Sequence, residues 1–74
     1  MDINQAIRLY QQSRRLLNQE RLIRAIVETK RRSRYFKSIG DTDTSYALMK
    51  QVRFAEQVLY SDDDTNNSEE GSQT

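Results

Sequence analysis

The chain has 74 residues, of which 35% are hydrophobic and 31% charged, and it contains no Cys, His, Pro or Trp. A chain this short forms one domain at most, and without Cys it has neither a disulfide framework nor a thiolate metal site. Without His it lacks the commonest general base and metal ligand. No apolar run approaches the ~20 residues of a membrane-spanning helix, so we expect no membrane span. Docking on a larger partner is the remaining route to stability for so small a core.

The formal net charge of +1 conceals a segregation of charge along the chain. Residues 1–60 hold twelve Lys and Arg against six Asp and Glu, a balance of +6, whereas residues 61–74 hold five acids and no base, a balance of −5. Segregated charge creates a local field that acts on partners and encounter rates rather than on the fold. The sequence therefore predicts an anionic partner.

The first predicted helix covers about residues 3–17. Asp2 can cap this helix, and Gln5 three residues later completes a capping-box pattern. Apolar residues recur at helical spacing along one stripe, which is typical of a helix that buries one face. The stripe consists of Ile3, Ala6, Ile7, Tyr10 and Leu17, and Leu9 and Leu16 widen it.

The second predicted helix covers about residues 19–38, with Asn18 as its N-cap. Its apolar residues Leu22, Ile23, Ile26 and Val27 have a helical period. One unbroken helix over residues 3–38 is the alternative, because no strong breaker precedes Gly40. We favour the break, since two short helices can fold back and share a core whereas one rod of ~50 Å cannot. Gly40 then ends the helix in the left-handed conformation.

The third predicted helix covers about residues 44–60, and Asp41 or Asp43 caps its positive end. Its apolar stripe consists of Leu48, Val52, Ala55 and Leu59. Residues 61–74 contain no apolar side chain, so burial cannot offset their ordering entropy and we expect an acidic disordered tail. The predicted fold is all-α, a three-helix antiparallel bundle over residues 1–60.

The residue types give no support for enzymatic chemistry. Nucleophilic catalysis needs a base beside the nucleophile, and without His or Cys only Lys or a carboxylate could serve. Glu20 and Glu28 share one helical face but lie ~12 Å apart among arginines, which indicates solvated ion-pair partners. The sequence therefore predicts no catalytic residue and no metal site, and a protein that is not an enzyme.

The stretch Lys30–Lys37, Lys-Arg-Arg-Ser-Arg-Tyr-Phe-Lys, carries the densest positive charge. Consecutive basic residues wrap around a helix end, where they complement the negative end of the helix dipole. Two functional interpretations stay open beside this structural one. The cations and the rings of Tyr35 and Phe36 could bind RNA, or the cations could meet the acidic surface of a protein.

Three elements of the sequence together resemble the LYR-motif family of small mitochondrial accessory and assembly proteins. The motif region is Ile7-Arg8-Leu9-Tyr10-Gln11, where Gln11 stands in place of the motif Arg or Lys and Arg14 and Arg15 follow one turn later. The second element is Arg32-Ser33-Arg34-Tyr35-Phe36-Lys37. The third element comprises Asp43, Leu48, Ala55 and Leu59. The resemblance covers residues 3–60.

The resemblance implies an adaptor that binds an acylated mitochondrial acyl carrier protein and docks it on a larger respiratory, iron–sulfur assembly or ribosomal complex in the matrix. The acyl-phosphopantetheine belongs to the carrier, so the chain needs no cofactor of its own. By this resemblance the partner-binding residues are Arg8, Tyr10, Arg14, Arg15, Arg34 and Lys37. The residues lining the acyl groove are Leu9, Phe36, Met49, Val52 and Ala55.

A weaker resemblance supports the alternative function. The start Ala6-Ile7-Arg8-Leu9-Tyr10 and the basic middle are similar to the bacterial S21 ribosomal proteins. This resemblance implies a small basic RNA-binding subunit of ribosomal type.

Overall fold

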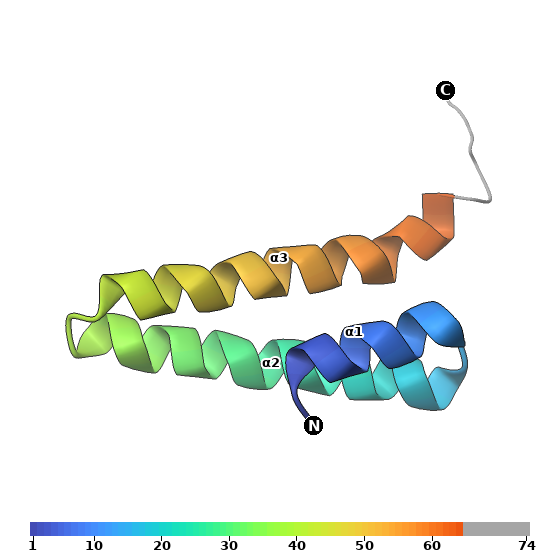
Figure 1. Cartoon of the computed structure of the whole chain (residues 1–74), viewed down its shortest axis with the longest axis horizontal. Coiled ribbons are helices and arrows are strands. Elements are labelled where there is room, and N and C mark those ends of the chain that lie inside the picture. Colours follow the sequence, from blue (N-terminus) through green and yellow to red (C-terminus); the bar gives the residue numbers. More distant parts are fainter. Residues whose placement is uncertain (65–74) are drawn as a thin grey trace.

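The computed structural model describes residues 1–64 and consists of three helices, α1 (Ile3–Gln12), α2 (Leu16–Ser38) and α3 (Thr42–Asp64). In Figure 1, α2 and α3 run antiparallel as a long hairpin, and the shorter α1 lies antiparallel to α2. The all-α, three-helix antiparallel bundle is thus confirmed. The predicted tail begins inside α3, whose last turn extends to Asp64, and the rest of that tail, residues 65–74, lies outside the described residues.

The hydrophobic core lies where α1 covers the hairpin. Its buried residues are Ile3, Ala6, Ile7 and Tyr10 of α1, Leu22, Ala25 and Ile26 of α2, and Val52, Ala55 and Val58 of α3. Toward the α2–α3 turn, beyond the reach of α1, the buried pair is polar: the Ser33 and Ser45 hydroxyl oxygens lie 2.8 Å apart. Four of the five stripe residues predicted for the first helix are buried, and this apolar face is what packs so short a helix against the hairpin.

The first helix is shorter than predicted. It ends at Gln12 rather than residue 17, because Ser13 adopts an extended conformation with φ −150° and ψ 121°. Leu16 and Leu17, which were placed on the buried stripe of the first helix, instead lie in the first turn of α2 and are 68% and 55% exposed. The predicted break between the helices is confirmed, but it covers residues 13–15 and not residue 18.

Two predicted N-caps are wrong in their mechanism. Asp2 occupies the N-cap position of α1, yet its side chain forms no capping hydrogen bond, so no capping box closes there. Asn18 lies inside α2. Its side-chain Nδ2 donates to the carbonyl oxygens of Leu9 at 3.2 Å and Ser13 at 2.9 Å, so this amide caps the C-terminus of α1.

The α2–α3 turn has the glycine conformation and the aspartate cap that the sequence predicted. Gly40 has φ +87°, its N–H donates to the Lys37 carbonyl at 3.1 Å, and the Asp41 N–H donates to the Phe36 carbonyl at 2.8 Å. This pair of bonds is a Schellman motif. Asp41 then caps α3, because its carboxylate accepts from the Thr44 N–H at 3.2 Å and from the Thr44 hydroxyl at 2.7 Å. Helix α3 begins two residues earlier and ends four residues later than the predicted range 44–60.

Candidate partner-binding surface

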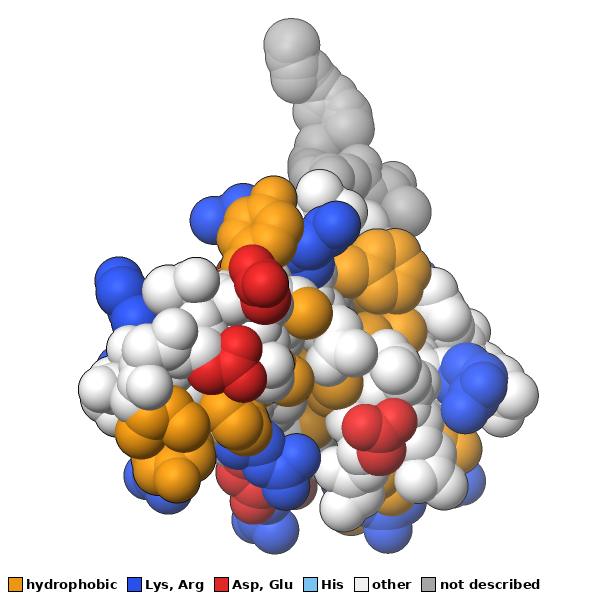
Figure 2. All heavy atoms as spheres, turned by 60° about the vertical axis from the view of Figure 1, so that its left-hand side comes forward, with side chains coloured by type: hydrophobic (Ala, Val, Ile, Leu, Met, Phe, Trp, Pro, Cys, Tyr) orange, Lys and Arg blue, Asp and Glu red, His pale blue; other side chains and the backbone are white. Residues whose placement is uncertain are grey.

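The basic stretch of α2 is distributed around the helix rather than along one face. Arg31, Arg32, Arg34 and Lys37 are exposed, whereas Ser33 between them is buried against Ser45 of α3. Lys30 forms an ion pair with Glu56 at 3.1 Å. The positive charge of this stretch therefore faces solvent in several directions, and Figure 2 shows cations beside surface hydrophobic side chains on the side that carries the α2–α3 turn.

The six predicted partner-binding residues fall into two groups. Arg8 is exposed on α1, and Arg14 and Arg15 lie in the turn that follows it. Arg34 and Lys37 are exposed near the opposite end of α2. Between Arg15 and Arg34 the helix rises by roughly 28 Å at 1.5 Å per residue. A short helix of a partner protein is therefore not long enough to contact both groups at once.

Tyr10 joins the first group to the core. Its side chain is only 2% exposed, and the Arg14 guanidinium carbon lies 5.1 Å from the centroid of its ring. A cation over an aromatic face is attracted by the ring quadrupole. The structure thus brings two predicted partner-binding residues, Arg14 and Tyr10, together at the end of α1.

The five residues predicted to line an acyl groove do not share a cavity among the described residues. Val52 and Ala55 have no exposed surface and belong to the closed core, with Met49 packed against it. Leu9 is half-buried at the end of α1. Phe36 is half-buried near the α2–α3 turn, where its ring lies edge-on to Tyr35 at 5.3 Å. An apolar chain that reached Val52 and Ala55 would have to part α1 from the hairpin.

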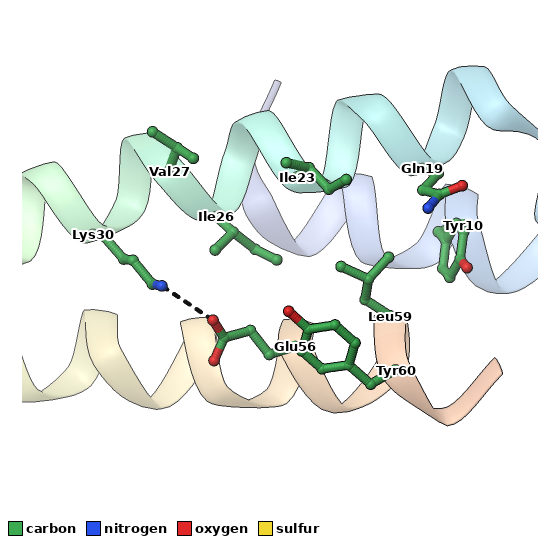
Figure 3. Close-up of a pocket in the computed structure, with 9 residues that line it drawn as sticks. All are labelled: Tyr10, Gln19, Ile23, Ile26, Val27, Lys30, Glu56, Leu59 and Tyr60. Carbon is green, nitrogen blue, oxygen red and sulfur yellow. Dashed lines mark ion pairs between the residues drawn. The ribbon is translucent and has the colours of Figure 1, made fainter. Parts of the chain in front are cut away.

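An open groove lies instead between α2 and α3, with a cavity volume of about 380 Å³. Ile23 and Val27 line one side and Leu59 and Tyr60 the other, with Tyr10 at one end (Figure 3). The exposed fractions of 43%, 44% and 60% for Ile23, Val27 and Tyr60 show that these side chains remain open to solvent. The sequence predicted one helical period for Leu22, Ile23, Ile26 and Val27, and of these Leu22 and Ile26 are buried. The spacing of four residues between Ile23 and Val27, next to Leu22 and Ile26, was the available signal for a second apolar row along α2.

The described part of the chain gives no support for a metal centre or a membrane span. Within it, no three His, Cys, Asp or Glu side chains gather closely enough to hold a metal ion. None of its helices combines the length and the apolar character that crossing a bilayer requires. The rest of the predicted acidic tail, residues 65–74, lies outside this part.

Comparisons with protein-family models, curated proteins and solved structures give no significant match for this chain.

Proposed function

We propose that this chain is a non-enzymatic adaptor that binds an acylated mitochondrial acyl carrier protein and docks it on a larger complex of the matrix. The observation that carries the proposal is the contact between Arg14 and the buried Tyr10, with their 5.1 Å separation. It joins exposed positive charge to the apolar interior at one end of the bundle. That combination suits a partner with an acidic surface and an apolar chain.

In this proposal the carrier meets the cations of α1 and the turn after it. Arg8, Arg14 and Arg15 contact the carboxylates of the carrier and the phosphate of its phosphopantetheine, because guanidinium groups bind both in a charge-assisted geometry. The Arg34 and Lys37 group, roughly 28 Å further along α2, is left for another contact. Gln11 adds no charge to the first group, so Arg14 and Arg15 supply what the family motif supplies one turn earlier.

The acyl chain passes Tyr10 and enters between α1 and the hairpin. Helix α1 is only ten residues long, so its displacement exposes the apolar faces of Leu9, Val52 and Ala55 without breaking either long helix. The chain then replaces the apolar contacts that α1 gives up. Binding to the folded form alone stabilises the fold by mass action, which suits a core this small.

A titration with carrier proteins of defined acyl length tests this function. We expect the myristoylated carrier to bind at least tenfold more tightly than the carrier with a bare phosphopantetheine thiol, because burial of each methylene contributes about 0.8 kcal/mol. Isothermal titration calorimetry measures both affinities. Arg14→Glu should weaken binding at least tenfold, and Arg34→Glu serves as the matched charge control. Equal affinity for the two carriers would show that no acyl chain is bound.

RNA binding is the second candidate, favoured by one observation. Tyr35 is 60% exposed and lies among Arg31, Arg32 and Arg34, so its ring is free to stack on a base beside cations that neutralise phosphates. The two functions differ in the factor that controls the affinity. RNA affinity should fall steeply with salt and with each cation removed, whereas carrier affinity should respond to the acyl chain.

A further inference from the structure

Three hollows follow one another along α3 and share lining residues. The groove of about 380 Å³ shares Glu56 and Tyr60 with a second hollow of about 530 Å³, which shares Arg53 with a third of about 290 Å³. We call this strip the α3 furrow. Its α3 side runs from Tyr46 to Tyr60. On α2, Ile23 and Lys37 border its two ends, and the middle hollow is lined by α3 alone. Each side rises by ~21 Å at 1.5 Å per residue, the length of four helical turns.

The α3 furrow has an apolar half and a basic half. Ile23, Val27 and Tyr60 form the apolar half, and all three are substantially exposed although they surround a hollow. At the other end, Lys37 and Arg53 flank the hollow beside Tyr46 and Met49. The Lys50 ammonium lies 5.5 Å from the centroid of the Tyr46 ring and adds a third cation at that end.

The balance of charge in the furrow is positive. Glu56 is the only acid lining the three hollows among the described residues, and it is already paired with Lys30 at 3.1 Å. In Figure 3 this ion pair lies at one end of the apolar half, and α1 lies behind the groove. The furrow thus presents unneutralised cations at one end and unfilled apolar surface at the other.

We propose that the α3 furrow binds an acidic amphipathic helix of a partner protein. About fourteen helical residues match its ~21 Å length. Apolar side chains at one end of that helix fill the groove between Ile23 and Tyr60, and carboxylates at its other end meet Lys37, Lys50 and Arg53. Helix-in-groove binding uses this combination of apolar anchors and charge complementarity.

Other occupants fit the two halves less well. Residues 65–74 of the chain contain two acids and no apolar side chain, so they could not fill the groove beside Ile23. A second copy would bring the basic helix of one chain against the cations of the other. A nucleic acid presents phosphate along its whole length, whereas the cations occupy one half of the furrow. The inference does not depend on the acyl carrier, because that proposal uses the cations of α1 and its turn.

A stapled fourteen-residue helical peptide tests the furrow on the full chain. The peptide carries Leu at i, i+3 and i+4 in one half and Glu on the same face in the other half, and stapling removes the entropy cost of helix formation. Amide chemical shifts measured by NMR should move for Ile23, Val27, Arg53 and Tyr60. Lys37→Glu with Arg53→Glu should weaken binding at least tenfold, and Arg8→Glu should leave it unchanged.

A second double variant, a control peptide and an oligonucleotide competitor complete the test of the furrow. Ile23→Ser with Val27→Ser should also weaken binding at least tenfold, and because both side chains are already partly exposed, the fold should survive. A control peptide with Lys in place of Glu should not bind. Equal binding of the two peptides, shifts confined to α1, or no binding at millimolar peptide would overturn the inference. So would displacement of the peptide by a lower concentration of oligouridylate, which would assign the furrow to RNA.

Discussion

Asn18 joins two helices through a single side-chain amide. Its Nδ2 donates to the carbonyl oxygen of Leu9, which also accepts from the Ser13 N–H, and to the carbonyl oxygen of Ser13 beyond the end of α1. Asn was expected to mark the break between the first two helices, and it does so, but from within the second helix. An amide carries both donors and an acceptor, so the residue type alone could not tell whether it would cap the start of one helix or the end of another.

Asn18→Asp distinguishes these two roles. Asn and Asp are about equally good N-caps, whereas at the observed site Asp replaces the donor with an acceptor that faces two carbonyl oxygens. We expect Asn18→Asp to lower the free energy of unfolding by about 2 kcal/mol, measured by urea denaturation followed by circular dichroism. Gln12→Glu adds the same charge at the exposed end of α1 and should change stability by less than about 0.5 kcal/mol. Equal stability of Asn18→Asp and the parent chain would contradict the capping role.

Helix boundaries were predictable where the turn chemistry is local. Gly40 and Asp41 fix the α2–α3 turn by a positive φ and a side-chain cap; residue type predicted the glycine and gave Asp41 as one of two candidate caps. The α1–α2 turn depends on Ser13, which no local rule distinguishes from a helical residue. Helix α3 runs past residue 60 because no Gly or Pro separates that position from Asp64.

The candidate site was less predictable than the fold, because it depends on how the helices cover one another and not on local sequence. Helical periodicity identifies which residues share a stripe, and it correctly grouped Ile3, Ala6, Ile7 and Tyr10. It does not reveal how much of the hairpin a ten-residue α1 leaves uncovered. Ile23 and Val27 share the helical period of Leu22 and Ile26, yet they are 43% and 44% exposed beside the groove between α2 and α3.

At the level of elements, α2 and α3 are joined by a polar contact beyond the apolar core. The Ser33 hydroxyl donates to the Ser45 carbonyl at 3.0 Å, and the two hydroxyl oxygens lie 2.8 Å apart. Both side chains are buried, so an unmet donor or acceptor there costs more than one at the surface. Their small size also lets the two helices lie close together near the turn.

Single and double alanine variants measure this contact. Ser33→Ala and Ser45→Ala should each lower the free energy of unfolding by about 1 kcal/mol, and the double variant by less than the sum, because it removes both partners at once. Ser38→Ala removes an exposed hydroxyl of α2 and should stay within about 0.5 kcal/mol. Additive effects of Ser33→Ala and Ser45→Ala in chemical denaturation would show that the two hydroxyls do not act as a pair.

At the scale of the whole molecule, charge and apolar surface are arranged on two separate faces. The cations of α1 and its turn adjoin the buried Tyr10, whereas the α3 furrow follows the α2–α3 hairpin, with Tyr10 lining its apolar end. An adaptor needs two such surfaces, one for the protein it carries and one for the assembly it serves. The small core adds a thermodynamic argument for the proposed adaptor, since each bound partner contributes stability to the folded chain.

Native mass spectrometry of the chain co-expressed with a mitochondrial acyl carrier protein tests the central claim most directly. We expect a one-to-one complex whose mass includes phosphopantetheine and a fatty acyl chain, and we expect that complex to dissociate in the Arg14→Glu variant. The acyl mass identifies the ligand without any assumption about the groove that holds it. A bare monomer, or a species whose extra mass is RNA, would contradict the claim.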